Sequence, residues 1–460
     1  MSQARHIFVQ TAAVGPARPC ARPPRALHRV ALATIALALG LALGACGGDD
    51  GDGGGGAKEQ AGITEGAKVA PTLQASQDAT GTVNFCMGKD STGAYPQAVK
   101  DFKKKYAGQG LTAKIVNFPT GADEARQQFV QRQEARSADC DVFYSDIIWT
   151  PEFARQKWVL DMTDYVEGRR GEFIPSALAP MKFDGKYWGV PLASGAGLLY
   201  YRDDRVPQVP DSLQAVYAQA KKNGGIVYQG GSYEGLTVNF LEVAYAAGGK
   251  VISDDGKKAL IDSPENLKAL QLMVDGVTSG AAPRAVVTYM EEEARRAFET
   301  GKPAFMRNWA YAYSLGQQAP KVKGKFKVAP LPAFEGGSRA GVLGGNSPVI
   351  SAYSKNPKGA VLLVDFITSP PIAEQNMVKF ALPAALAETY DAPAVKKAVP
   401  FAAELKQAIA QAKPRPVSAV YPLISQAIYK NVNRALSRSI SPQAALKRAQ
   451  SQIEEALQTF

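Results

Sequence analysis

Segments of helical periodicity alternate with short apolar runs in the region after residue 80. Apolar side chains three or four positions apart, such as Ala98, Phe102 and Tyr106, predict a helix. Mostly apolar runs bounded by turn-forming residues predict strands. The predicted order is strand 82–87, helix 95–106, strand 112–118, helix 122–134, strand 141–145 and helix 151–156. Helices between strands indicate parallel pairing through right-handed crossovers, so the pattern predicts an α/β fold.

The same alternation continues further along the chain. A strand is predicted over 225–228 and a helix over 235–247, which Gly248 ends as a C-cap glycine. Ser263-Pro264 and Ser441-Pro442 begin two more helices, with serine at the N-cap and proline at the first helical position. Ligands of α/β sheets collect at the carboxyl ends of the strands. The short segments 87–90 and 146–149 follow two such ends and are candidates for contacts with a ligand.

The N-terminal segment has the pattern of a secretory signal. A basic segment with Arg18, Arg22, Arg25 and Arg29 precedes an apolar run over 30–43, and Gly44 and Ala45 stand before Cys46. This looks like a bacterial lipoprotein signal, in which the chain is cut before the cysteine and the thiol takes a lipid. The alternative, an uncleaved transmembrane helix, needs about 20 apolar residues, more than the run offers. We expect residues 1–45 to be removed and Cys46 to anchor the protein on the extracytoplasmic face of the cell membrane, periplasmic or cell-surface.

Glycine and aspartate dominate the residues that follow Cys46. Such a sequence cannot bury apolar surface and behaves as a flexible linker. We therefore expect a tether over 46–80 and a folded body that begins near Gly81. A body of this length is enough for two domains.

Charge and histidine content narrow the function. The formal net charge of +11 falls to +6 once residues 1–45, with five arginines and no acid, are removed. No basic block stands out, so nucleic acid is not an expected partner. Both histidines, His6 and His28, lie in the removed segment. The mature chain then lacks the commonest general base and metal ligand, which argues against most enzyme classes and against a metal site.

Cys86 and Cys140 are the two cysteines that remain besides the lipidated Cys46. An extracytoplasmic location favours a disulfide between them. The predicted strands argue the other way, because Cys86 lies near the end of one strand and Cys140 before the start of another. That arrangement favours a Cα separation beyond the limit of ~7 Å for a disulfide. The residues alone leave the pairing open.

Two aromatic and cationic segments are candidates for ligand contacts. Trp309, Tyr311 and Tyr313 point the same way if the chain is extended there. Such a row can stack on sugar rings, but a strand that buries its rings in a core explains it too, and the residues alone favour the core. A proline-stiffened loop presents Arg415 and Tyr421. Arg415 offers a planar set of donors, and a surface ion pair accounts for it equally well.

Seven short motifs follow one another along the body of the chain. They are Ser-Asp-Ile-Ile-Trp-Thr-Pro-Glu-Phe at 145–153, Asp-Gly-Lys-Tyr-Trp-Gly-Val-Pro at 184–191, Leu-Leu-Tyr-Tyr-Arg at 198–202, Tyr-Glu-Gly-Leu at 233–236, Phe-Met-Arg-Asn-Trp-Ala-Tyr at 305–311, Leu-Gly-Gly at 343–345 and Arg-Pro-Val-Ser-Ala-Val-Tyr-Pro at 415–422. Their order behind a lipoprotein signal resembles the extracellular solute-binding proteins (family 1) of bacterial ABC importers, in the branch with maltose- and trehalose/maltose-binding proteins. The likeness covers essentially residues 81–460.

The resemblance implies a two-lobed α/β fold of the periplasmic-binding-protein type (type II), with a hinge and an interlobe cleft. Lobe 1 is expected over 81–195 plus 345–391, and lobe 2 over 196–344 plus 392–460. In relatives, carboxylates and an arginine hydrogen-bond sugar hydroxyls, aromatic rings stack on the sugar, and a glycine pair lets it approach the backbone. The ligand-binding residues this implies are Lys89, Asp90, Asp146, Glu234, Trp309, Tyr311, Gly344, Gly345, Asn346, Arg415 and Tyr421.

Two positions depart from the family pattern. Relatives often carry an acid where this chain has Gly195, and a tryptophan after the glycine pair where it has Asn346. The first change removes a hydroxyl acceptor, and the second exchanges an aromatic wall for an amide. Both lie at the expected cleft, so the resemblance allows a ligand other than maltose or trehalose.

The resulting expectation is a substrate-binding lipoprotein that captures a carbohydrate by hinge closure and delivers it to a membrane permease. We expect a monomer without a cofactor, and a separate ATPase chain because the sequence contains no P-loop motif. One alternative is a binder of a non-sugar solute, such as a polyol or a small zwitterion, on the same fold. Another is an exported glycosidase using Asp146 and Glu234, which needs two carboxyl groups ~5–10 Å apart.

Overall fold

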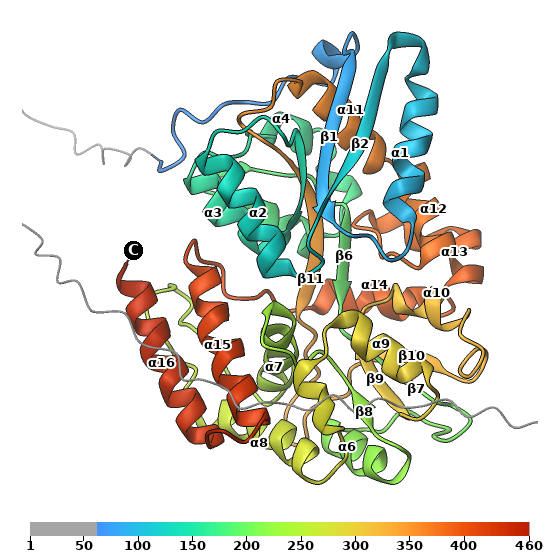
Figure 1. Cartoon of the computed structure of the whole chain (residues 1–460), viewed down its shortest axis with the longest axis vertical. Coiled ribbons are helices and arrows are strands. Elements are labelled where there is room, and N and C mark those ends of the chain that lie inside the picture. The colour runs from blue at the N-terminus through green and yellow to red at the C-terminus, as the bar shows by residue number, and fades with distance from the viewer. Residues whose placement is uncertain (1–61, 460) are drawn as a thin grey trace, which may run out of the picture. The chain divides into compact units, whose positions relative to one another are not determined.

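Two separate sheets organise residues 62–459, the part of the chain that the computed structural model describes (Figure 1). The strands are β1 (Gly81–Gly88), β2 (Leu111–Phe118), β3 (Val142–Asp146), β4 (Lys182–Phe183), β5 (Lys186–Tyr187), β6 (Ala193–Ala196), β7 (Leu198–Tyr201), β8 (Ile226–Val227), β9 (Phe305–Asn308), β10 (Lys327–Pro330) and β11 (Leu343–Ile350). The first of the two large sheets has the order β2-β1-β3-β11-β6 and the second β10-β7-β9-β8, while β4 and β5 form a small two-stranded sheet. We call the units around the two large sheets lobe 1 and lobe 2. The two-lobed α/β fold predicted from the sequence is confirmed.

Helices surround both sheets (Figure 1). They are α1 (Ala94–Lys105), α2 (Ala122–Glu134), α3 (Thr150–Arg155), α4 (Thr163–Glu167), α5 (Pro175–Leu178), α6 (Leu213–Lys222), α7 (Glu234–Ala246), α8 (Pro264–Thr278), α9 (Glu291–Glu299), α10 (Ala312–Gly316), α11 (Pro357–Ile367), α12 (Pro370–Phe380), α13 (Pro393–Ala398), α14 (Ala402–Gln411), α15 (Tyr421–Leu436) and α16 (Pro442–Gln458). None of the helices within residues 62–459 is both long and apolar enough to cross a membrane.

The lobe 1 sheet is parallel at β2-β1-β3 and antiparallel where β11 joins β3 and β6. Alternate residues of β1 face opposite cores. Phe85 belongs to one core with Tyr95 and Phe102 of α1, and Cys86 to another with Phe129 of α2. Burial on both faces explains the apolar run from Phe85 to Met87 in β1.

Helix ends follow the capping chemistry that the sequence indicates. The side chains of Ser263 and Ser441 accept hydrogen bonds from the backbone N–H groups of the residues three positions on, at the starts of α8 and α16. After α7, Gly248 takes a positive φ of 91°. The backbone N–H of Gly249 then donates to the carbonyl of Ala244 at 2.8 Å, which closes the helix.

Three chain crossings connect the lobes. The first passes through Gly197 between β6 and β7. The second and third run side by side, because Leu343 and Lys413 pair through the N–H of Leu343 and the carbonyl of Lys413 at 2.9 Å. Before the third crossing, α14 packs on lobe 1, where Ser176 donates to the carbonyl of Ile409 at 2.8 Å. The expected boundary at residue 392 is therefore about twenty residues too early, and α13 and α14 belong with lobe 1.

Residues 62–80 do not continue the expected tether but lie against lobe 1. Thr64 is buried, and its N–H and hydroxyl both donate to Asp184, at 2.9 and 2.7 Å. The Ala70 N–H donates to the carbonyl of Asp161 at 2.9 Å. The predicted start of the folded body near Gly81 is therefore too late. The prediction extended the tether from the glycine-rich stretch over residues 62–80, although these residues contact lobe 1. The expected signal over 1–45 and the lipidated Cys46 lie outside the described residues.

Cys86 and Cys140 form a disulfide, with their Cα atoms 5.7 Å apart. The argument from strand ends was wrong because β1 and β3 are paired next to these residues, with Cys86 opposite Phe143. Cys140 lies just before β3, and its side chain reaches Cys86 on the neighbouring strand β1. Both side chains are buried in the core between β1, β3 and α2.

Candidate functional site

Arg415 lies between two carboxylates that belong to different lobes. Its Nη1 donates to Glu234 of lobe 2 at 2.8 Å, and its Nη2 donates to Asp146 of lobe 1 at 2.5 Å. The Arg415 side chain is 2% exposed, Glu234 7% and Asp146 17%. Burial makes each of these interactions stronger than on a surface, and it makes the loss of any partner costly. These three residues, which the sequence analysis predicted as separate ligand contacts, form the centre of the candidate site.

Local structure places each of the three side chains. Asp146 ends β3 and caps the short helical turn that follows, where it accepts from the Ile148 N–H at 3.1 Å. Glu234 is the first residue of α7. Arg415 follows the third crossing, between two prolines that fix the backbone. The strand end, the helix start and the stiff loop therefore meet where the lobes meet.

Tyr421, the first residue of α15, adds a hydroxyl group to this set of three. It is fully buried, and its hydroxyl donates to Glu234 at 2.5 Å. Ser425 donates to the other Glu234 oxygen. The Tyr421 ring packs into the apolar cluster of lobe 1 that contains Ile148 and Trp149, so it lies where the two lobes meet. The expected role of Tyr421 as an aromatic stacker stays a prediction. Ser425 was missed, since a serine inside a helix gives no signal in the sequence.

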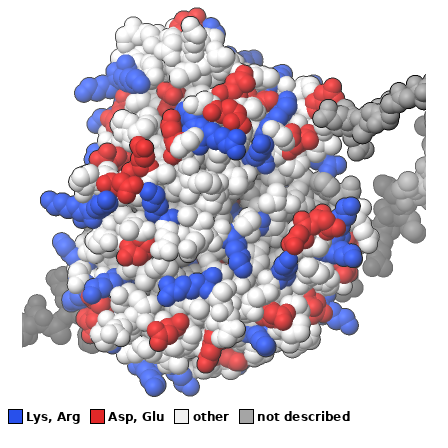
Figure 2. Space-filling model, turned by 180° about the vertical axis from the view of Figure 1, so that it is seen from behind, with Lys and Arg blue, Asp and Glu red and all other residues white. Residues whose placement is uncertain are grey.

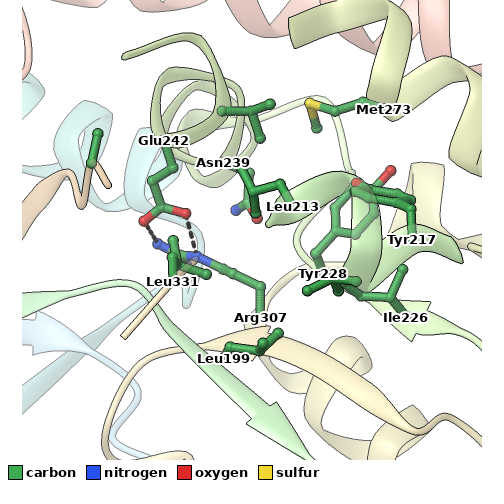
Figure 3. A pocket seen from close by; sticks show the side chains of 13 residues that line it. Leu199, Leu213, Tyr217, Ile226, Tyr228, Asn239, Glu242, Met273, Arg307 and Leu331 are labelled. Carbon is green, nitrogen blue, oxygen red and sulfur yellow. Dashed lines mark hydrogen bonds and ion pairs between the residues drawn. The ribbon is translucent and has the colours of Figure 1, made fainter. Parts of the chain in front are cut away.

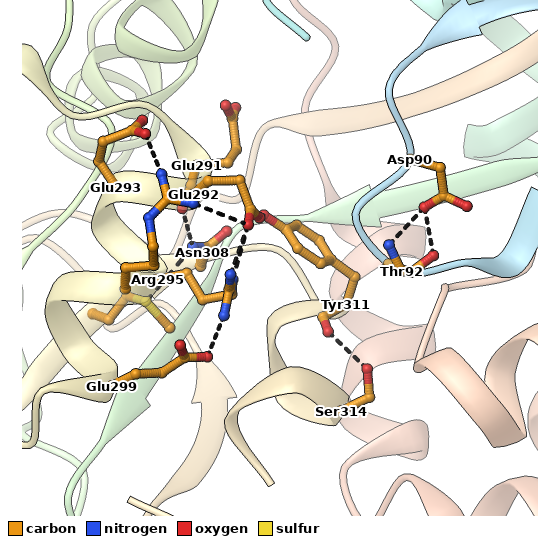
Figure 4. Close-up of polar contacts among 12 residues, drawn as sticks. Asp90, Thr92, Glu291, Glu292, Glu293, Arg295, Glu299, Asn308, Tyr311 and Ser314 are labelled. Carbon is orange, nitrogen blue, oxygen red and sulfur yellow. Dashed lines mark hydrogen bonds and ion pairs between the residues drawn. The ribbon is translucent and has the colours of Figure 1, made fainter. Parts of the chain in front are cut away.

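Trp309, Tyr311 and Tyr313 do not form a row on an extended chain. Strand β9 ends at Asn308, and the chain turns into α10 directly afterwards. The Trp309 ring is half-buried, with the Arg307 guanidinium 4.1 Å from its centre. Tyr311 turns away and donates its hydroxyl to Glu292 at 2.8 Å (Figure 4). Trp309 is thus neither sealed in a core nor a member of a row.

The glycine pair on β11 faces protein. A Cβ added to Gly344 would lie 2.7 Å from the Trp309 ring, and one added to Gly345 would lie 2.4 Å from the Ala193 carbonyl. The indole therefore lies against the bare backbone of Gly344. The prediction was that a sugar, and not a protein side chain, approaches the backbone there. Two residues on, Asn346 pairs across the sheet with Asp146. Strand β11 thus links Trp309 to the charged set over about 7 Å.

Asp90 is committed to its own loop. One carboxylate oxygen accepts from the N–H and hydroxyl of Thr92 at 2.7 and 2.6 Å (Figure 4). The other oxygen accepts from the Tyr95 N–H at 3.0 Å. These bonds hold the start of α1 in place. Lys89 beside it is exposed. The first strand end therefore offers a carboxylate that already has local partners, unlike the expected free acceptor.

Two further acids at the lobe boundary were missed by sequence reasoning. Asp123 of α2 accepts from the Glu234 backbone N–H at 3.0 Å, which adds a second bond between the lobes. Burial raises the pKa of the Asp123 carboxyl. Burial also raises the pKa of the Glu291 carboxyl at the start of α9. Both lie in the first turns of helices, where acids are common for capping reasons alone, so their positions in the sequence do not mark them as members of a site.

The family model of the bacterial extracellular solute-binding proteins matches residues 88–374. The chain belongs to this family. A probable ABC transporter-binding protein of Deinococcus radiodurans is 34% identical over 75% of this chain and 86% of its own length. Among solved structures, maltose-bound MalE3 of T. maritima is 33% identical, with a TM-score of 0.77 over 81% of this chain and 99% of its own. A ribitol-bound solute-binding protein of Agrobacterium radiobacter, 21% identical with a TM-score of 0.74, shares the fold.

This solute-binding protein is accordingly the binding component of an ABC transporter, and its family consists of binding proteins and not enzymes. The two departures from the family pattern lie beside Trp309 and Asp146. A Cβ on Gly195 would come within 3.7 Å of the Trp309 ring, so an acid there would lie against the indole. Asn346 is half-buried next to Asp146. Both departures therefore change the surroundings of residues at the lobe boundary.

The charged set gives this solute-binding protein a specific pH dependence. Burial raises the pKa of the Glu234 carboxyl to about 7, against the opposing effect of Arg415 and with a further rise from Asp146. The folded protein thus holds this proton more tightly than the unfolded chain, where the ordinary value is 4.5. The free energy of unfolding should therefore decrease as the pH rises from about 4.5 to about 7, and this group should contribute up to about 3 kcal/mol to the decrease.

Urea unfolding of the wild type and of Glu234→Gln at pH 5 and pH 8 measures this effect. The substitution should remove part of the decrease, because glutamine does not titrate. Glu404→Gln, on the exposed side of α14, is the matched control and should keep the wild-type difference. Equal pH differences in all three proteins would contradict the assignment.

Proposed function

We propose that this solute-binding protein captures a neutral carbohydrate of the maltose or trehalose class between its lobes and delivers it to a membrane permease. The observation that carries the proposal is the sharing of Arg415 by Asp146 of lobe 1 and Glu234 of lobe 2. A ligand that replaces or extends these bonds contacts both lobes at once. Charge-assisted hydrogen bonds to hydroxyl groups are about twice as strong as neutral ones.

The donors and acceptors of the site suit hydroxyl groups better than a charged ligand. Asp146 and Arg415 largely balance each other's charge, and the raised pKa of Glu234, about 7, reduces its average negative charge near neutral pH. The Arg415 Nε–H is buried and has no hydrogen-bond partner among the described residues. It is a donor that a sugar hydroxyl or a water molecule can use. The half-buried Trp309 ring supplies a flat apolar surface. It lies against Gly344 of β11, two residues before Asn346.

Hinge closure provides the mechanism. A ligand that binds groups of both lobes favours the closed form over the open one by its difference in affinity for the two. The bonds from Arg415 to Asp146 and from the Glu234 N–H to Asp123 stabilise closure already without ligand. The loaded, closed protein would dock on the permease. A separate ATPase chain would drive transport through that permease. Lipidation at Cys46 would keep it at the membrane.

A thermal-shift screen tests the proposal. Maltose, trehalose, longer glucans, polyols and betaine should be compared, because a true ligand raises the melting temperature by mass action. A shift with maltose or trehalose is expected. Trp309→Ala should abolish that shift and lower the unliganded melting temperature by only a few degrees, since the ring is half-buried. No shift with any saccharide would contradict the proposal.

A non-sugar solute is the second candidate, and the Gly195 and Asn346 departures favour it. Without the acid at 195 and an aromatic wall at 346, the site has fewer contacts for a second sugar ring. A shift with a polyol or betaine and none with saccharides would select this candidate. Hydrolysis is disfavoured because Arg415 bonds both Asp146 and Glu234. Incubation with maltooligosaccharides should therefore give no cleaved product.

A further inference from the structure

A buried ion pair lies inside lobe 2, away from the charged set of the proposed site. Arg307 of β9 donates to both oxygens of Glu242 on α7, at 2.8 and 2.5 Å, and the two side chains are 4% and 3% exposed (Figure 3). The third guanidinium nitrogen donates to Gln229 at 2.9 Å. Asn239 holds Gln229 in turn through a bond of 3.1 Å. The guanidinium is thereby fixed in both position and plane.

Stability alone does not account for this pair. Desolvation of two charges offsets most of their attraction, so apolar residues of similar size often stabilise a core as well or better. The pair also borders a cavity of about 40 Å³, among apolar side chains such as Leu199, Leu213 and Met273 (Figure 3). The apolar surroundings and incomplete packing point to a purpose other than stability for the charges.

The free face of the guanidinium lies on the Trp309 ring. The Arg307 Cζ is 4.1 Å from the ring centre, a distance typical of cation–π stacking. On the benzo side the ring meets the backbone of Gly344, where an added Cβ would lie 2.7 Å away. One face of the indole therefore lies on a fixed cation of lobe 2, and its benzo side meets the bare β11 backbone.

The same pair lies directly under the first crossing between the lobes. A Cβ on Gly197 would lie 2.0 Å from the Glu242 carboxylate and 2.5 Å from the Arg307 Nη2. Only a residue without a side chain lets the crossing strand approach the pair so closely. The pair therefore contacts both the crossing at Gly197 and the aromatic ring at the lobe boundary.

We propose that the Glu242–Arg307 pair is a positioning device that fixes the orientation of the Trp309 ring and ties it to the crossing at Gly197. The importance of that orientation for ligand capture rests on the proposed function. A stacking ring that is oriented before the ligand arrives costs less to order on binding. Arg307 and Glu242 act through Trp309 and have no contact with the ligand themselves.

The test follows the ring directly and uses no ligand. The full chain labelled with 5-fluorotryptophan has four fluorine signals, and the Trp309→Phe variant identifies the one from Trp309. The double variant Glu242→Leu with Arg307→Met removes both charges, so no unpaired charge stays buried. Its Trp309 signal should move and broaden or split, while those of the other tryptophans stay in place.

Two further variants separate positioning from a structural role. Arg307→Lys keeps the charge beside Glu242 but has no flat group to lie on the indole, so it should also broaden the Trp309 signal. The matched control, Glu152→Leu with Arg126→Met, removes a similar pair from lobe 1 and should leave the Trp309 signal unchanged. A Trp309 signal that stays the same in both the double variant and Arg307→Lys would overturn the proposal. Since no ligand is present, that outcome is distinct from a failure to bind carbohydrate.

Discussion

Replacing Arg415 by methionine should abolish carbohydrate binding and lower the free energy of unfolding by about 3 kcal/mol. The cation bonds Asp146 and Glu234, and its removal leaves two buried carboxylates without their charged partner. The loss of binding follows because the bonds that join the lobes through Arg415 are lost. Urea unfolding gives the stability, and titration calorimetry with a sugar that shifts the wild-type melting temperature gives the affinity.

Arg126→Met is the control for this prediction. Arg126 also pairs with a carboxylate, Glu152, but within lobe 1, and its side chain is 21% exposed. A partly exposed pair contributes about 1 kcal/mol or less, and its loss should leave affinity unchanged. If Arg415→Met bound the sugar as tightly as Arg126→Met does, Arg415 could not be the residue that joins ligand and lobes.

Removing the disulfide should have the largest effect on stability alone. Cys86 and Cys140 close a loop of 54 residues, so replacing both by alanine should lower the free energy of unfolding by about 4 kcal/mol. The bond restricts the unfolded chain more than it changes the folded one. Carbohydrate affinity should stay at the wild-type value, because both residues lie inside lobe 1. Urea unfolding of the wild type and the double variant measures the difference.

Reductant provides the control for the disulfide. Wild-type protein unfolded with a reducing agent should approach the stability of the double variant, whereas the variant itself should not respond. A wild type that is insensitive to reductant and as stable as the double variant would show that the two thiols are not joined in solution.

The regular elements of the fold were accessible from the sequence because local chemistry determines them. Helix α2 has the predicted bounds, 122–134, and the serine caps of α8 and α16 act as predicted. Two predictions failed where a long-range contact decides the structure. Residues 62–80 follow a glycine-rich stretch but dock on lobe 1, and α14 packs on lobe 1 although it follows the expected boundary.

The candidate site was partly accessible in the same way. Asp146 and Arg415 carry the chemistry that the resemblance implied, and the structure brings them together. The packing of Tyr421 was not accessible from the sequence, because the direction of a side chain at a helix start depends on what the helix packs against. Asp123 and Ser425 gave no signal, since acids in a first helical turn and serines on helices are ordinary.

A crystal structure with the saccharide that raises the melting temperature most is the most direct test of carbohydrate capture between the lobes. The expected result has sugar hydroxyl oxygens within hydrogen-bond distance of Asp146 and Arg415, and a sugar ring lying on the face of Trp309. A saccharide bound on one lobe alone, or at a place away from these three side chains, would contradict the account.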